Sequence, residues 1–208
     1  MYTEILNKNY LLLILISYLI GSIPSAILTS KIMGLKDPRT FGSKNPGATN
    51  MLRTGNKIAA IATLIGDISK GYIGLKIVQV YYHHNPQIEI ICCSAIAILL
   101  GHIYPIFTKF VGGKGVATFF GILINIEPTL AFISFITWLI TTKIYKYSSL
   151  SSIIVSLLTP IYYILFDKIL WKTEKPFLML IITICTIILS RHRNNIIRLL
   201  QNKENKIK

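Results

Sequence analysis

Apolar residues along the chain fall into seven stretches that are separated by short polar segments. A membrane-spanning helix needs roughly 20 mostly apolar residues, and several of the stretches approach or exceed that length. The stretches are residues 10–33, 58–82, 88–108, 116–126, 129–142, 150–166 and 177–190. The pattern predicts an all-α polytopic membrane protein with seven transmembrane helices, folded as one domain over residues 1–208.

The fourth and fifth stretches are short, and together they would also make one long helix. The sequence Asn125-Ile126-Glu127-Pro128 lies between them. A charge followed by a proline is poorly tolerated in a lipid-facing helix. We therefore expect a turn at this point and two separate spans.

The distribution of lysine and arginine predicts the orientation of the spans. The segment 34–57 holds five of them, 81–87 holds none, Lys109 and Lys114 follow, and none lies near Glu127. Lys143 and Lys146 come next, then a mixed segment 167–175 and a tail with six basic residues. Segments rich in lysine and arginine alternate with segments that hold few of them only if the chain has seven spans. The positive-inside rule then places the N-terminus outside and the C-terminus in the cytoplasm.

Composition supports this class of protein. Hydrophobic residues make up 52% of the chain and charged residues only 14%, whereas soluble domains average about a quarter charged residues. The net charge of +14 is explained mostly by the orientation signal and also by a role in attracting anionic lipid headgroups. A nucleic-acid partner is not needed to explain it. Cys92, Cys93 and Cys185 lie in apolar stretches and are expected to be core residues. We expect no metal site and no cofactor.

The segment Gly112-Gly113-Lys114-Gly115 lies between two apolar stretches. Glycines let backbone N–H groups approach an anion closely, and the lysine adds a mobile cation. The segment therefore favours a phosphate-bearing ligand at the membrane surface. The alternative is a tight, positively charged turn, because short glycine motifs are weak evidence of a site.

Other polar groups are expected on the same side of the membrane. Residues 37–50 are rich in hydroxyls, amides and glycines, and Arg53 follows them. The serines of segment 147–152 are expected mostly to cap the next helix. His192, Asn195 and Arg198 are spaced three apart and should share one helical face. Within the spans, Asp67 and Lys70 are expected to form a structural pair, with His102 as a packing histidine.

Several motifs in order resemble the bacterial acyl-phosphate:glycerol-3-phosphate acyltransferase family. They are Gly21-Ser22-Ile23-Pro24, residues 42–50, Asp67-Ile68-Ser69-Lys70-Gly71, Gly101-His102-Ile103-Tyr104-Pro105, residues 112–118 and His192-Arg193-Asn194-Asn195-Ile196. The resemblance implies a seven-helix enzyme of the bacterial inner membrane with a cytoplasmic site. It also implies transfer of a fatty acyl group from acyl phosphate to the 1-hydroxyl of glycerol 3-phosphate. The product is lysophosphatidic acid, in the first step of phospholipid biosynthesis. The implied partners are the two substrates, the lipid bilayer and the enzyme that makes acyl phosphate.

Carried over residue by residue, the resemblance implies a polar site. The implied catalytic residues are His192, Ser43 and Lys114. The implied substrate-binding residues are Asn45, Thr49, Asn50, Arg53, Gly112, Gly113, Gly115, Ser149 and Asn195. Lys44 and Asn202 stand where the family usually has glycine, while Glu204 fits the family pattern.

The substrates and motifs indicate direct transfer. An acyl phosphate is a mixed anhydride with a good leaving group, so the main task is to position two anions and stabilise developing charge. The base is either His192 or the phosphate of the acceptor. No histidine is followed at +5 by aspartate, and no serine lies in a nucleophile elbow, so a covalent acyl-enzyme is not expected.

Two other classes of protein fit parts of the pattern. A transporter of phosphorylated metabolites would also have a basic pocket in a polytopic chain. It would need polar groups open to both faces, and transporters often contain internal repeats, which this sequence lacks. A structural membrane scaffold would leave the ordered motifs unexplained.

Overall fold

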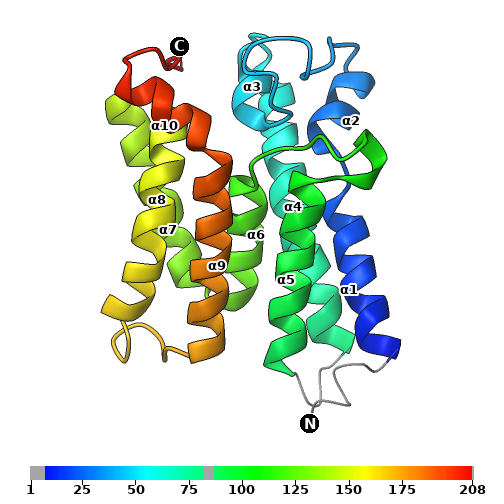
Figure 1. Ribbon diagram of the computed structural model, residues 1–208, viewed down its shortest axis with the longest axis vertical. Helices are drawn as coiled ribbons and strands as arrows, with labels where there is room; N and C mark the ends of the chain where they lie inside the picture. The colour runs from blue at the N-terminus through cyan, green and yellow to red at the C-terminus, as the bar shows by residue number, and fades with distance from the viewer. Residues whose placement is uncertain (1–7, 82–86, 208) are drawn as a thin grey trace. The chain divides into compact units, whose positions relative to one another are not determined.

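The computed structural model describes residues 8–81 and 87–207, and the described residues are mainly helical. The chain divides into two compact units, Met1–Asn125 and Ile126–Lys208. The first unit contains α1 (Lys8–Gly21), α2 (Ser25–Ile32), α3 (Ala48–Leu52), α4 (Lys57–Tyr81), α5 (Ile88–Ile103), the 3-10 turn η1 (Ile106–Thr108) and α6 (Val116–Ile126), which ends at the boundary. The second contains α7 (Pro128–Tyr145), α8 (Ser148–Leu165), α9 (Lys175–Arg191) and α10 (Arg193–Leu200). Figure 1 labels these helices.

The helices are those of an integral membrane protein, which confirms the predicted all-α membrane class. Among the described residues, four helices are long and apolar enough to cross a membrane, and six spans result if each bent pair counts as one. The apolar α6 is shorter, with 11 residues. Segment 81–87, expected to be an outer loop, lies mostly outside the described residues.

The first predicted span is not a continuous helix. It divides into α1 and α2, which are bent by 43°, because Pro24 between them has no N–H to donate and its ring opposes a helical preceding residue. The break exposes backbone carbonyls that need partners within a membrane. The Lys70 ammonium of α4 donates to the Ile23 carbonyl at 2.8 Å and supplies one.

Glycines let the helices of the first unit approach closely. A Cβ on Gly21 of α1 would lie 2.1 Å from the Ile98 carbonyl oxygen of α5, and one on Gly121 of α6 would lie 2.0 Å from the Ile68 carbonyl oxygen of α4. Small residues at helix contacts are typical of membrane bundles, where van der Waals packing replaces the hydrophobic effect between helices. Figure 1 shows α1, α4 and α5 side by side, and they contact one another.

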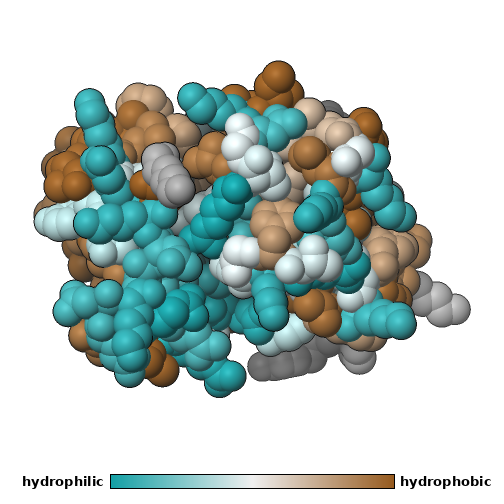
Figure 2. Space-filling model, turned by 90° about the horizontal axis from the view of Figure 1, so that it is seen from above, coloured by the Kyte–Doolittle hydropathy of each residue, from teal (hydrophilic) through white to brown (hydrophobic). Residues whose placement is uncertain are grey.

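The polar segment 34–57 is anchored at one end of the first unit. Its short α3 places Met51 in a buried cluster with Ala26 of α2 and with Ala59 and Ala60 of α4. The Ser30 hydroxyl also lies 3.4 Å from the Met51 sulfur. This apolar underside fixes the segment on α2 and α4 and leaves its polar residues at the end of the bundle. Figure 2 views the molecule from above and shows many hydrophilic side chains on this face, mixed with hydrophobic ones.

The predicted turn between the fourth and fifth stretches is confirmed. Helix α6 ends at Ile126, and Glu127 is the N-cap of α7, where its side chain accepts a hydrogen bond from the Thr129 N–H at 3.3 Å. Pro128 takes the first helical position, where the missing N–H has no helical partner to lose.

The predicted capping role of the serines in segment 147–152 is wrong. The N-cap of α8 is Tyr147, and no side chain caps it. Instead, two of the serines connect α8 with α7: Ser151 accepts from Thr142 at 2.7 Å, and Ser152 accepts from the Trp138 indole at 3.2 Å. Hydrogen bonds from serine and threonine hydroxyls between neighbouring helices are typical of membrane helix bundles.

Candidate active site

The side chain of Asn50 organises the polar segment 34–57. Asn50 is only 1% exposed. Its amide oxygen accepts from the Ser43 N–H at 2.9 Å, and its amide nitrogen donates to the Pro38 carbonyl at 2.7 Å. The Arg53 guanidinium lies 3.5 Å from the same amide oxygen. Asn50 thus folds the segment and brings two other predicted site residues, Ser43 and Arg53, to one place, where both side chains are exposed.

Lys44 occupies a backbone conformation that favours glycine. Its φ is +56°, in the left-handed region, and Asn202 in the tail has φ +55°. Only glycine adopts this region without a steric penalty, although asparagine tolerates it better than lysine. Both departures from the family pattern are therefore at positions where the fold needs glycine-like freedom. Asn45 and Thr49, on either side of Pro46 and Gly47, are partly buried in the same segment.

The glycines of segment 112–115 are required for packing on α5. A Cβ on Gly112 would lie 2.2 Å from the His102 carbonyl oxygen, and one on Gly113 would lie 2.1 Å from the His102 Nε2. The Gly113 N–H also donates to that carbonyl at 3.1 Å, so this N–H is committed to the protein. Gly115, with φ +92°, would place a Cβ 2.5 Å from Leu99.

Lys114 is the charged residue of this segment, and its neighbours are glycines. It is partly buried, whereas Lys109 is exposed at the end of η1. Lys114 lies two residues before Val116, at which α6 begins. The N-terminus of a helix presents unpaired N–H groups and favours negative charge, and a lysine beside it strengthens that preference. The arrangement suits a phosphate.

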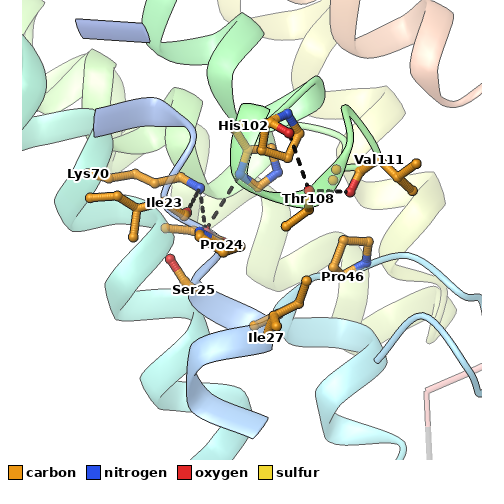
Figure 3. A pocket seen from close by; sticks show the side chains of 14 residues that line it. Ile23, Pro24, Ser25, Ile27, Pro46, Lys70, His102, Thr108 and Val111 are labelled. Carbon is orange, nitrogen blue, oxygen red and sulfur yellow. Dashed lines mark hydrogen bonds and ion pairs between the residues drawn. The ribbon is translucent and has the colours of Figure 1, made fainter. Parts of the chain in front are cut away.

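A small pocket in the first unit brings the two segments together. Pro46 of the polar segment lines it with Gly112 and Gly113, and its space, including the part open to solvent, is about 250 Å³. The α1–α2 break, α4 and α5 also contribute to its wall. Figure 3 shows Pro46, Thr108, His102 and Lys70 around this space.

A buried polar network forms one wall of this pocket. Lys70 lies 3.0 Å from a carboxylate oxygen of Asp67, and the His102 Nδ1 lies 3.5 Å from the same oxygen. The expected Asp67–Lys70 pair is therefore confirmed. His102 contacts both this pair and the glycine segment, so the network joins α4, α5 and the α1–α2 break at the wall of the pocket.

In the second unit, His192 lies at the bend between α9 and α10. The two helices are bent by 57° there, and His192 is 3% exposed. Its Nδ1 lies 2.8 Å from the Ile188 carbonyl oxygen. A carbonyl only accepts, so the neutral ring carries its proton on Nδ1 and its lone pair on Nε2.

Ser149 and Asn195, from α8 and α10, meet at the carboxylate of Glu204. The Ser149 hydroxyl and the Asn195 amide donate to one carboxylate oxygen at 2.8 and 2.7 Å, and the Arg198 Nε donates to the other at 2.7 Å. Burial alone would raise the pKa of Glu204, but the hydrogen bonds from Arg198, Asn195 and Ser149 outweigh it and hold that pKa below its ordinary value. Asn195 and Arg198 therefore share one face of α10, as predicted, whereas His192, the third residue of that prediction, is the N-cap before the helix. Arg198 also forms an ion pair with Glu204 within this unit.

The structure thus gathers the predicted residues into two sets, one in each unit. Ser43, Asn50 and Arg53 lie together in the first unit, and Pro46 connects their segment with the glycine segment. In the second unit, Ser149 and Asn195 lie together, and the backbone N–H of Asn195 donates to the His192 carbonyl at 2.8 Å. Sequence reasoning gave Glu204 no role. The signals were its fit to the family pattern and its position six residues after Arg198, and neither reveals a contact with Ser149.

Comparison with known proteins identifies the family. The family model described as glycerol-3-phosphate acyltransferase matches residues 11–202. A glycerol-3-phosphate acyltransferase of Bordetella pertussis is 45% identical over 197 residues, which cover 94% of this chain and 90% of the relative. One of Burkholderia multivorans is 45% identical over 198 residues, covering 95% and 90%.

Solved structures agree with the sequence relatives. A crystal structure of PlsY (YgiH), an integral membrane glycerol 3-phosphate acyltransferase, in its glycerol 3-phosphate form is similar with a TM-score of 0.85 and 32% identity, covering 97% of this chain and 96% of that one. The lysophosphatidic acid form gives a TM-score of 0.84 with the same identity and coverage. On these grounds, the chain belongs to the glycerol-3-phosphate acyltransferase family.

Proposed function

We propose that this membrane acyltransferase uses an acyl phosphate as its donor and esterifies the 1-hydroxyl of glycerol 3-phosphate. The products are 1-acyl-glycerol 3-phosphate, which is lysophosphatidic acid, and inorganic phosphate. The observation that carries this proposal is the position of Lys114. It is partly buried and stands just before the N-terminus of α6, in a segment whose glycines line a pocket together with Pro46 of the polar segment.

Many of the candidate residues are hydrogen-bond donors or cations, because each of the two substrates carries a phosphate. In the first unit, Ser43, Lys114 and Arg53 act on phosphate oxygens, with Asn50 holding Ser43 and Arg53 in place. Asn45, Thr49 and the backbone of Gly112, Gly113 and Gly115 shape the binding surface. In the second unit, His192, Asn195 and Ser149 act on the acceptor.

The reaction proceeds by direct transfer. The oxygen of the glycerol 1-hydroxyl attacks the acyl carbonyl carbon, a new C–O ester bond forms, and the bond between that carbon and the phosphate oxygen breaks. Phosphate leaves with the bonding electron pair. The hydroxyl proton passes to the lone pair on the His192 Nε2 or to the phosphate of the acceptor, and the hydrogen bond from Nδ1 to Ile188 supports the first route.

An acyl-enzyme trap tests direct transfer. Purified protein is incubated with a labelled acyl phosphate alone, denatured and analysed for retained label. Direct transfer predicts no stoichiometric label on the protein. Label that survives denaturation on a serine, cysteine or histidine would overturn this step.

The same purified protein separates the enzyme from a transporter. In detergent there are no compartments, so transport has no meaning, whereas acyl transfer needs only the two substrates. Formation of 1-acyl-glycerol 3-phosphate from acyl phosphate and glycerol 3-phosphate supports the proposal. If no product forms under conditions in which the protein stays folded, the proposal fails.

We also propose seven spans, with the N-terminus outside and the polar segment 34–57, Lys114 and the tail in the cytoplasm. The alternation of basic segments supports this orientation, and so does the confirmed turn at Glu127. The membrane is then the bacterial inner membrane, and acyl phosphate arrives from the enzyme that makes it. Single cysteines at Asn56, Glu127 and Asn205 in a cysteine-free variant test the orientation by labelling from outside. Labelling of Glu127→Cys alone is expected, and labelling of all three from the same face would contradict the proposal.

A further inference from the structure

Glu204 lies in the tail that follows α10, and its carboxylate is the meeting point of three side chains from two helices. The Glu204 side chain is 7% exposed, and both of its oxygens accept short hydrogen bonds. Two of the donors, Ser149 and Asn195, are residues to which the proposed function assigns the acceptor substrate. We propose that Glu204 is a positioning residue that fixes the Ser149 hydroxyl and the Asn195 amide for binding glycerol 3-phosphate, an inference that rests on the proposed function.

The tail is held in place independently of Glu204. The Ile207 N–H donates to the Lys146 carbonyl at the end of α7 at 2.7 Å, and the Lys203 N–H donates to the Arg198 carbonyl at 2.7 Å. The Lys206 ammonium lies 5.5 Å from the centre of the Tyr147 ring. These contacts tie the tail to α10 and to the two residues that precede α8, so the carboxylate is held at a defined point.

The chemistry of the carboxylate determines what it fixes. An ionised carboxylate only accepts hydrogen bonds, and a serine hydroxyl has one hydrogen. Glu204 therefore receives the single hydrogen of Ser149, and the hydroxyl presents lone pairs in its other directions. The same oxygen receives an N–H of Asn195, which fixes which way the amide faces and directs its carbonyl oxygen away from Glu204. Both groups lose rotational freedom before substrate arrives, which reduces the entropy that binding must overcome.

The geometry also distinguishes this role from a competing one. In the competing role, the Glu204 carboxylate would occupy the place of the substrate phosphate on Ser149 and Asn195, and glycerol 3-phosphate would have to displace it. Three features favour positioning: the depth of burial, the separate backbone anchors of the tail, and the Arg198 pair that neutralises the Glu204 charge. The two roles predict opposite effects when Glu204 is removed, because a positioning residue strengthens binding and a competitor weakens it.

The test compares Glu204→Ala, Glu204→Gln and the exposed neighbour Asn205→Ala as a matched control. Removing the Glu204 carboxylate takes away the hydrogen bonds that fix the Ser149 hydroxyl and the Asn195 amide. Glu204→Ala is therefore expected to raise the KM for glycerol 3-phosphate by roughly 10-fold or more. The KM for acyl phosphate should stay near that of the wild type. Glu204→Gln keeps a carbonyl acceptor for Ser149 and Asn195, so it should restore part of the affinity. Asn205→Ala should behave like the wild type.

A double-mutant cycle separates positioning from a general contribution to the fold. If Glu204 acts through Ser149 and Asn195, adding Glu204→Ala to a Ser149→Ala/Asn195→Ala variant should have little further effect on the KM for glycerol 3-phosphate. A lower KM in Glu204→Ala would show a competing tail. Equal rises in the KM for glycerol 3-phosphate and the KM for acyl phosphate, together with a lower Tm, would show a purely structural role. Either outcome overturns the proposal.

Direct binding of glycerol 3-phosphate, measured by calorimetry without a donor, keeps the two proposals apart. If the wild type binds glycerol 3-phosphate but transfers no acyl group, the proposed reaction fails while Glu204 can still be judged from the binding constants. If the wild type transfers the acyl group and Glu204→Ala binds as tightly as the wild type, the reaction stands and the role of Glu204 is refuted.

Discussion

Replacing Lys114 by alanine tests whether the glycine segment binds a substrate or is only a turn. The glycines themselves are accounted for by their packing against His102 and Leu99, so they cannot decide the question. Lys114 can, because it is the charged residue of the segment. It is partly buried beside the N-terminus of α6, where an anion would be stabilised by both the ammonium and the helix N–H groups.

The expected magnitude follows from the loss of one charged hydrogen bond to a phosphate. Such a bond is worth about 1.5–3 kcal/mol, and each 1.36 kcal/mol is tenfold in rate. Lys114→Ala should therefore lower kcat/KM by roughly 10- to 150-fold. Lys109→Ala is the matched control, because Lys109 is exposed and its φ of +55° remains occupied by a residue with a Cβ. It should change kcat/KM by less than about twofold, since an exposed charge contributes little.

The assay is steady-state acyl transfer by purified protein in detergent, with each substrate varied in turn and thermal unfolding recorded for both variants. Lys114→Ala should keep the Tm of the wild type while losing activity. Equal and mild effects of the two substitutions would refute the reasoning and reduce the segment to a positively charged turn. A loss of activity that follows a loss of Tm in Lys114→Ala would also contradict it, since the lysine would then support the fold.

Three further substitutions probe the chemistry and the fold. If His192 is the base, His192→Ala should lower kcat by about 10²–10⁴-fold and remove the acidic limb of the pH–rate profile. If His192 only binds substrate, His192→Ala should mainly raise the KM for glycerol 3-phosphate, and His192→Asn should restore part of the lost affinity. Lys44→Gly should raise the free energy of unfolding by about 0.5–1 kcal/mol. Relief of the left-handed φ of Lys44 is worth about 1–2 kcal/mol, which exceeds the cost of the extra backbone entropy that glycine loses on folding. Lys36→Gly is the control, because Lys36 has no positive φ, and it should give no gain in Tm. Lys70→Met should lower the free energy of unfolding by about 3–5 kcal/mol, because it removes the lysine partner of the buried Asp67 carboxylate. Adding Asp67→Asn should recover part of the lost Tm.

The helices were predictable from the sequence because apolar stretches and breakers are local signals. The turn before Pro128 needed only a charge and a proline next to each other, and it occurs where the sequence placed it. The bend at Pro24 shows the limit of that reasoning. Its proline is a local signal, but the Ile23 carbonyl is satisfied by Lys70, which lies 47 residues away in the chain.

The candidate site was predictable in its residue types and less so in its contacts. A segment rich in amides and hydroxyls could be recognised, but Asn50 turned out to build the segment, because its amide reaches Pro38 and Ser43 across a loop that no short-range pattern describes. Ser149 likewise pairs with Glu204, 55 positions away. Such contacts depend on how helices pack, so they become visible only in the folded chain.

Donor choice is the measurement that tests the central claim most directly. Purified protein in detergent is given labelled glycerol 3-phosphate with a long-chain acyl phosphate, the corresponding acyl-CoA or the corresponding acyl carrier protein thioester, and the lipid product is quantified. The account predicts 1-acyl-glycerol 3-phosphate, with release of one phosphate per product, from the acyl phosphate alone. Comparable product from either thioester, or no product from the acyl phosphate, would contradict it.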